Sequence, residues 1–223
     1  MLRPEQILYE DNHLLVINKP AGVVTQGASA DQTSLGHQAK HYLKTKYHKP
    51  GNVFLGFVSR LDKLTTGVIL LARTSKAAAR LTEAFKNRKV SKTYEALVER
   101  ADLPDSDTLT DFVRKNDAAR KMETCHPEAR NGQQAILHFQ LLNHYQSATH
   151  LEINLETGRK HQIRIQFSNF GCPILGDRKY NSAINFSNGI ALHSTQLTIN
   201  HPTTKELLTF KAPLPTEWNS WMQ

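Results

Sequence analysis

The chain has 223 residues and a mass of 25.2 kDa, enough for one sizeable hydrophobic core or two small ones. Its longest apolar runs, such as 68–72, are far shorter than the roughly 20 residues of a transmembrane helix, and its first residues lack the apolar core of a signal peptide. Its two cysteines, Cys125 and Cys172, belong to no CxxC or Cys/His group, which argues against a disulfide-rich secreted domain and a structural zinc site. We therefore expect a cytoplasmic protein with no membrane partner.

Lysine and arginine total 28 against 20 acidic residues, which gives a formal net charge of +8 and a pI of about 9.5. Such an excess suits a polyanionic partner such as nucleic acid, although it also occurs in proteins that bind none. Charge alone leaves both alternatives open.

The first predicted element is a hairpin over residues 7–22, because two short apolar runs flank the turn-forming pair Asp11-Asn12 and a Pro-Ala-Gly turn ends the second. Helical spacing of apolar residues predicts a helix over 33–47 that exposes several lysines. A strand over 68–73 follows, then a helix over 75–89 with Ser75 as its N-cap, then a strand over 92–99.

The middle of the chain, 100–132, is polar and is predicted to be loops around a short strand at 110–113. Paired strands follow at 134–142 and 148–155, then a short helix within 158–171 that ends at Gly171. Two late strands, at 191–200 and 205–212, flank a His-Pro turn. Strands outnumber helices and most connections are too short for parallel crossovers, so we expect an α+β fold with a mixed, mainly antiparallel sheet.

The stretch 57-FVSRLDKLTTG-67 holds a single carboxylate, Asp62, between Arg60 and Lys63. An opposite charge a few ångströms away favours the ionised form of an aspartate. Such a group can serve as a nucleophile or a base without a metal. A surface ion pair or a capping acid would explain the same residues equally well.

A second candidate is Arg164, in 156-ETGRKHQIRIQF-167. A helix from about Lys160 would place Arg164 beside Ile163 on one face, where its guanidinium could pair with Asp62 through two hydrogen bonds. The alternative is a solvated helix, with His161 and Gln162 bonded to the backbone.

Three further candidates have plain structural alternatives. Tyr94 can fill the core with its hydroxyl bonded, or stack on a planar base. Lys19, in 18-NKPAG-22, can be solvated at a turn or take part in the site. Arg178, after the turn at Gly176-Asp177, can position a phosphate or close a loop.

Together and in this order, the segments resemble the RluA family of pseudouridine synthases, with 60-RLDKLTTG-67 and 157-TGRKHQIR-164 as the most specific motifs. The resemblance extends over 7–24, 60–72, 92–98, 155–166 and 171–180. It implies a largely antiparallel sheet in two halves flanked by helices, with a central RNA-binding cleft. It also implies a single catalytic domain over 1–223 without the S4 RNA-binding module of many relatives.

By this resemblance Asp62 is the active aspartate, Tyr94 stacks on the target base and Arg164 pairs with the aspartate. Arg60 would displace the target nucleotide, and Ile163 would line the pocket. Lys19 and Arg178 are further candidates for substrate contact. Ser59 departs from the family pattern, since many members have histidine before the RLD motif, and we expect a change in the grip on RNA rather than in the chemistry.

Isomerising a uridine breaks the bond from C1′ to N1 and joins C1′ to C5 of the same base, so we expect no cofactor and no metal. The expected partner is ribosomal or transfer RNA, bound by a monomer. Two other classes remain: a non-catalytic RNA-binding protein, and a hydrolase or nuclease, which would need a second acid close to Asp62 that no nearby DxD or HxxE spacing supplies.

Overall fold

The computed structural model describes residues 2–27 and 33–223. The chain divides into two compact units, which are described separately. Unit 1 comprises Met1–Lys92 and Ser194–Leu214, and unit 2 comprises Thr93–His193 and Pro215–Gln223. No helix in the described ranges has both the length and the apolar character needed to cross a membrane.

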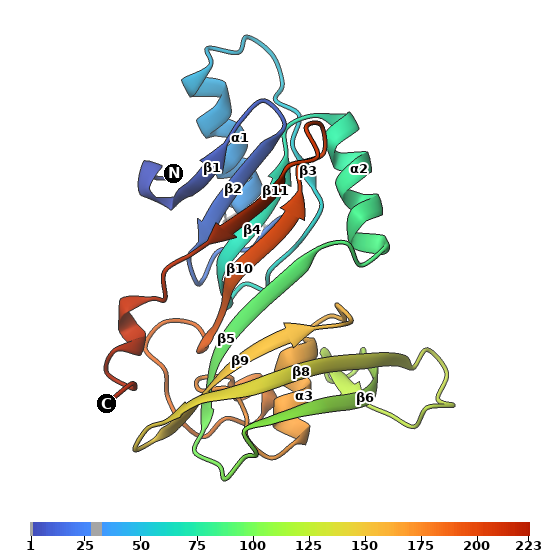
Figure 1. The fold of residues 1–223 in the computed structure, drawn as a ribbon, viewed down its shortest axis with the longest axis vertical. Coiled ribbons are helices and arrows are strands. Elements are labelled where there is room, and N and C mark those ends of the chain that lie inside the picture. Colours follow the sequence, from blue (N-terminus) through green and yellow to red (C-terminus); the bar gives the residue numbers. More distant parts are fainter. Residues whose placement is uncertain (1, 28–32) are drawn as a thin grey trace. The chain divides into compact units, whose positions relative to one another are not determined.

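Unit 1 is a sheet with two helices (Figure 1). Its strand order is β1-β2-β4-β10, with β3 paired to β4 and β11 paired to β10. The strands are β1 (Ile7–Glu10), β2 (Leu14–Lys19), β3 (Gly56–Phe57), β4 (Thr66–Ala72), β10 (Leu192–Asn200, from Ser194 on in this unit) and β11 (Leu207–Lys211). The helices are α1 (Leu35–Lys46) and α2 (Ser75–Lys86).

The two central strands β2 and β4 are buried along almost their whole length, because both faces of the sheet are covered. Leu14 and Val16 pack in a cluster with Leu81 of α2. Their neighbours Leu15 and Ile17 point to the opposite face and belong to a cluster that includes Leu35, Ala39 and Leu43 of α1. Successive side chains of β2 thus point to opposite faces of the sheet and contribute to two cores, one under each helix.

Unit 2 has the strand order β5-β9-β8-β6-β7 and one helix (Figure 1). Its elements are β5 (Ser91–Glu99), β6 (Ser106–Asn116), β7 (Lys121–Thr124), β8 (Gln133–His144), β9 (Ala148–Leu155) and α3 (Gln162–Asn169). Short 3₁₀ turns complete the chain at Pro4–Gln6, Arg178–Tyr180 and Thr216–Trp218. All four strand pairs within this unit are antiparallel.

The predicted α+β class with a mainly antiparallel sheet is confirmed, as are the first hairpin and all three helices. Two boundaries differ: α2 is capped by the Thr74 side chain, which accepts from the Ala77 N–H, rather than by Ser75. Helix α3 begins at Gln162, so Lys160 precedes it.

The prediction of loops around a short strand at 110–113 is wrong for most of the stretch 100–132, although the strand itself is present within a longer one. An eleven-residue strand, β6, and a hairpin to β7 occupy much of this stretch. Only Leu109 and Val113 of β6 are buried, so the strand shows little of the apolar alternation by which strands are recognised. Its pairing with β8 over eight residues stabilises a strand that its own sequence does not indicate.

Candidate active site

Asp62 lies in unit 1, in the loop 58–65 that joins β3 to β4. Its side chain is half-buried, whereas Arg60 is exposed. The main-chain carbonyl of Asp62 accepts a hydrogen bond from the Thr65 N–H at 3.2 Å, which closes a turn directly after the aspartate. The carboxylate therefore sits on a turn with a fixed main-chain path and retains access to solvent.

The segment that follows β2 holds this loop through main-chain and side-chain hydrogen bonds. The Thr25 hydroxyl donates to the Leu61 carbonyl at 2.9 Å and accepts from the Leu61 N–H at 3.3 Å. The Gly22 N–H donates to the Lys63 carbonyl at 2.9 Å, with Gly22 in the left-handed region at φ 80°. Residues on both sides of Asp62 are thus bonded to the segment 19–25, Leu61 to Thr25 and Lys63 to Gly22.

Lys19 adds further hydrogen bonds to the Asp62 loop. Its side chain is fully buried, and its Nζ donates to the carbonyls of Pro20 and Val23 at 2.9 Å and of Lys63 at 3.2 Å. Burial lowers the pKa of Lys19 to about 7, and the negative charge of Asp62 acts in the opposite direction. The expected contact of Lys19 with RNA stays a prediction; the enclosure of its ammonium by three carbonyls supports a role in holding the loop.

Ser59, the departure from the family motif, is half-buried in the same loop. Its hydroxyl donates a long hydrogen bond of 3.4 Å to the Leu70 carbonyl of β4. The serine is therefore bonded to its own unit rather than presented as an exposed recognition group.

Tyr94 lies in unit 2 on β5, where its ring is 6% exposed. Within the described part of the chain, no hydrogen bond from its hydroxyl is found. The purely structural alternative was a core tyrosine with its hydroxyl bonded. The buried ring agrees with it, and the hydroxyl does not.

Arg164 projects from α3 and is buried in unit 2. Its Nε and Nη2 donate to the two carboxylate oxygens of Asp177 at 2.6 and 2.8 Å, and its guanidinium carbon lies 5.0 Å from the centre of the Tyr180 ring. The two bonds to Asp177 use two of the five N–H donors of a guanidinium. A carboxylate and an aromatic face thus fix the orientation of Arg164.

Sequence reasoning missed both of these partners. Asp177 was assigned only to a turn, and Tyr180 was not singled out. A usable signal existed: an arginine on an apolar helix face needs a carboxylate, and Asp177 is the first acid downstream of Arg164. Of the other predicted site residues in unit 2, Ile163 is buried and Arg178 is exposed, with its guanidinium bonded to Asn185.

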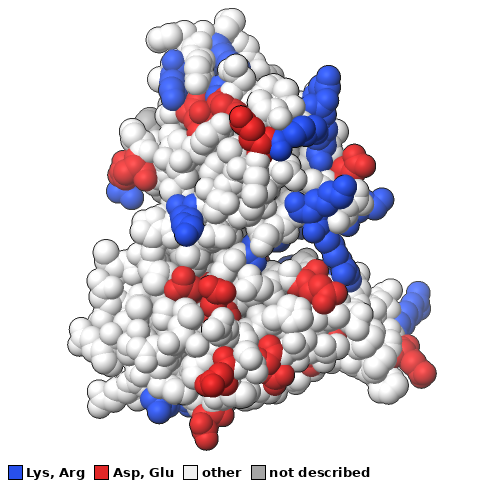
Figure 2. Space-filling model, in the orientation of Figure 1, with Lys and Arg blue, Asp and Glu red and all other residues white. Residues whose placement is uncertain are grey.

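Charge is divided unequally between the two units. Unit 1 contains 17 lysines and arginines against 7 acidic residues, whereas unit 2 contains 11 against 13. On the face drawn in Figure 2, basic side chains gather over α2 in unit 1, and acidic side chains are prominent over the strands of unit 2. The basic character of the whole protein therefore resides in unit 1, the unit that contains Asp62.

Comparison with known proteins agrees with these features. The model of the RNA pseudouridylate synthase family matches residues 13–169. The chain is 35% identical over 212 residues to the uncharacterized RNA pseudouridine synthase YlyB of Bacillus subtilis, covering 94% of this chain and 69% of that protein. It is 34% identical over 227 residues to the ribosomal large subunit pseudouridine synthase D of Yersinia pestis, covering 95% and 68%.

Among solved structures, the human RNA pseudouridylate synthase domain containing 4 is similar with a TM-score of 0.81 and 27% identity, over 98% of this chain and 93% of that one. The human RNA pseudouridylate synthase domain containing 1 follows with a TM-score of 0.76 and 26% identity, over 94% and 83%. Fold and sequence together define an RNA-modifying isomerase. The chain belongs to the RNA pseudouridylate synthase family, which confirms the resemblance inferred from its motifs.

Proposed function

We propose that the enzyme converts a uridine of large-subunit ribosomal RNA to pseudouridine, with Asp62 as the catalytic residue. The observation that carries this proposal is the hydrogen-bonded setting of the Asp62 loop, in which Thr25 holds Leu61 before the aspartate and Lys19 holds Lys63 after it. Similarity to relatives named for the ribosomal large subunit supports the choice of RNA. Transfer RNA is the alternative substrate.

In the proposed reaction, the target uridine is turned out of its stack, at a cost of a few kcal/mol that contacts to neighbouring phosphates offset. Asp62 then attacks C1′, or removes the C2′ proton to give a glycal, and the bond from C1′ to N1 breaks. The detached uracil rotates and C5 bonds to C1′, which breaks the bond from Asp62 to C1′ or, in the glycal route, is accompanied by return of the proton to C2′. The C5 proton leaves last and N1 takes up a proton, so the product is an isomer of the substrate.

The remaining roles are proposed from the family resemblance. Tyr94 would stack on the uracil during its rotation. Its ring is buried, but no hydrogen bond from its hydroxyl is found in the described part of the chain, which supports an added role in loss of the C5 proton. Arg164, oriented by Asp177, would pair with Asp62. Arg60, exposed on the same loop as Asp62, would take the place of the displaced nucleotide, and Ile163 would line the pocket.

Lys19 and Arg178 complete the proposed set of substrate-binding residues. The exposed position of Arg178 supports a contact with phosphate, whereas the buried ammonium of Lys19 supports an indirect contribution through the loop. We further propose a single catalytic domain over 1–223, a monomer as the active form and the cytoplasm as its compartment.

The test is an assay of purified protein on an in vitro transcript of large-subunit ribosomal RNA and on unmodified transfer RNAs. Pseudouridine is mapped by carbodiimide adducts that stop reverse transcriptase. The wild-type protein should produce one or a few stops in the ribosomal transcript. Asp62→Asn should bind the same RNA and produce none, whereas the matched control Asp102→Asn, at an exposed acid of unit 2, should behave as wild type.

Each result has a separate meaning. Stops confined to transfer RNA would support the proposed reaction and show that transfer RNA, rather than ribosomal RNA, is the substrate. Full product from Asp62→Asn would refute the catalytic assignment. Tight binding by the wild type without product in either RNA would favour the non-catalytic RNA-binding alternative.

A further inference from the structure

Unit 2 contains a cavity of about 270 Å³ with a basic lining, remote in sequence from the RLD motif. It is lined by Lys115, Asp117, Arg120, Lys121, Met122 and Lys160. Four cations and one carboxylate thus line the cavity, in a unit whose acidic residues outnumber its basic ones. Like charges repel, so this local concentration is unfavourable unless an anion binds there.

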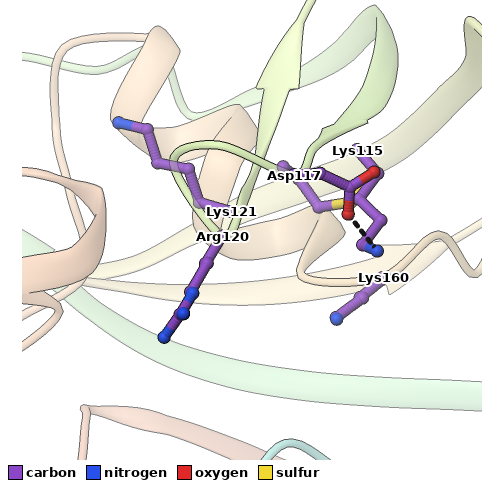
Figure 3. A pocket seen from close by; sticks show the side chains of 6 residues that line it. Lys115, Asp117, Arg120, Lys121 and Lys160 are labelled. Atoms are coloured by element: carbon purple, nitrogen blue, oxygen red, sulfur yellow. Dashed lines mark ion pairs between the residues drawn. The ribbon is translucent and has the colours of Figure 1, made fainter.

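The single acid of the cavity does not cancel this charge. Asp117 forms an ion pair with Lys115, drawn as a dashed line in Figure 3. The next acid along the hairpin, Glu123, is engaged elsewhere, because it accepts hydrogen bonds from Arg114 at 2.7 Å and from Asn116 at 2.6 Å. Arg120 and Lys160 are both exposed, and neither makes a side-chain hydrogen bond or ion pair within the described part of the chain.

The side chains differ in how they lie (Figure 3). Lys160 lies beside the Lys115–Asp117 pair, and Arg120 extends from the hairpin turn toward the same side as Lys160. Lys121 extends away from them, so it contributes its stem to the wall more than its ammonium to the centre. The lining contains no aromatic ring on which a base could stack, and lysine and arginine are the usual ligands of phosphate.

The two segments that supply the cations are fixed to one another. The Tyr180 hydroxyl accepts a hydrogen bond from the Met122 N–H at 3.0 Å and is bonded to His161 Nδ1 at 2.8 Å. One side chain therefore connects β7, which follows Arg120, to the residue after Lys160. The hairpin turn itself is held by the Asn116 side chain, which accepts from the Ala119 N–H at 2.9 Å.

Arg120 and His161 both adopt left-handed backbone conformations, with φ of 50° and 54°, which non-glycine residues rarely adopt. The hairpin thus keeps an arginine where glycine would fit with less strain. Such outliers gather at functional sites, where the surrounding structure holds them.

We propose that this cavity binds a backbone phosphate of the RNA substrate through Arg120, Lys160 and Lys115. The inference rests on the proposed function, since it assumes that the chain acts on RNA. The Tyr180 ring that joins the two basic segments also lies against the Arg164 guanidinium. A phosphate bound in the cavity would therefore share its structural support with the arginine assigned to the reaction.

The test measures equilibrium binding of an in vitro transcript of large-subunit ribosomal RNA by the full chain, over a range of salt concentrations. The variant Arg120→Gln with Lys160→Gln should weaken binding about 10- to 50-fold near 0.1 M salt and lower the salt slope by about 1.5, the loss expected for two phosphate contacts. The matched control is Arg130→Gln with Lys211→Gln, which removes one exposed arginine and one exposed lysine elsewhere and should bind more tightly than the cavity variant.

A second variant acts in the opposite direction. Asp117→Asn removes the only acid of the cavity and releases Lys115, so it should tighten binding a few-fold and raise the salt slope. A misfolded protein would not gain affinity, so this result separates charge from structural damage. RNA affinities of the cavity variant equal to those of the control would overturn the proposal. Because the readout is binding, an absence of pseudouridine would count against the proposed function and not against this site.

Discussion

The Lys19 ammonium donates a hydrogen bond to the Lys63 carbonyl, 3.2 Å away, at the residue that follows Asp62. Two more carbonyls, those of Pro20 and Val23, complete its three acceptors. Only the charged form of a lysine offers three donors, yet burial disfavours that form. In Lys19, which holds the Asp62 loop, the hydrogen bonds therefore favour the charged form and burial favours the neutral form.

We predict that Lys19 makes stability depend on pH. Its pKa falls from 10.5 in the unfolded chain to about 7 in the folded protein, so between these values the unfolded state binds more protons. The free energy of unfolding should then rise with pH across this window, by up to about 1.4 kcal/mol per pH unit, relative to a protein without the lysine. Below pH 7 both states are charged, and the full cost of burial is present.

Urea unfolding of wild type and Lys19→Met at pH 6.5, 7.5, 8.5 and 9.5 measures this difference. The exposed Lys40→Met is the control, and its difference from wild type should not change with pH in this way. A flat difference for Lys19→Met as well would mean that the three carbonyls keep the lysine charged throughout.

A second prediction concerns Gly67, the register partner of Lys19 in the β2–β4 pair. Its φ of 107° lies in the range that favours glycine, and a Cβ there would fall 2.3 Å from the Ser194 carbonyl oxygen. Gly67→Ala should lower the free energy of unfolding by roughly 3 kcal/mol or more, since it adds a clash with main-chain atoms to the conformational strain. The control Gly51→Ala, with an ordinary φ and open space around it, should change it by less than about 0.5 kcal/mol. Equal effects in chemical denaturation would contradict this account.

A third prediction tests the buried pair of Arg164 and Asp177. Their side chains are 5% and 1% exposed, so removing the carboxylate's charge breaks a buried ion pair and leaves the guanidinium charge buried. Asp177→Asn should destabilise the protein by about 3–5 kcal/mol, whereas Asp102→Asn, at an exposed acid, should have little effect. Chemical denaturation gives both values. If Asp177→Asn proved as stable as wild type, the pair would not be what orients Arg164.

The parts of the fold that could be predicted are those with a strong local signal. Helix α1 has helical apolar spacing and the Ser34 cap, and the first hairpin has a turn pair, in which Asp11 accepts from two main-chain N–H groups. Strand β6 lacks such a signal because its second face is solvated, and it forms through its long pairing with β8. The sequence therefore predicts an irregular loop, and not a cavity, for Lys115 of this strand and Arg120 of the turn after it.

The residues of the candidate site could be predicted from the sequence, but the hydrogen bonds that hold them in place could not. The motifs identify Asp62 and Arg164 through family resemblance. The hydrogen bonds that hold the Asp62 loop join Lys19 to Lys63 and Thr25 to Leu61, 44 and 36 positions apart. No local pattern specifies such contacts, because they arise only when β2 pairs with β4.

The last prediction addresses that support directly. Thr25→Val removes both hydrogen bonds to Leu61 while keeping nearly the same volume, and Thr25→Ser keeps the hydroxyl. Because small misplacements of a catalytic group cost much of its rate, Thr25→Val should slow single-turnover formation of pseudouridine roughly 10-fold or more, with RNA affinity nearly unchanged. Thr25→Ser should restore most of the rate. A parallel loss of RNA affinity would show instead that the threonine supports binding, and a rate equal to wild type would show that Lys19 and Gly22 suffice to hold the Asp62 loop.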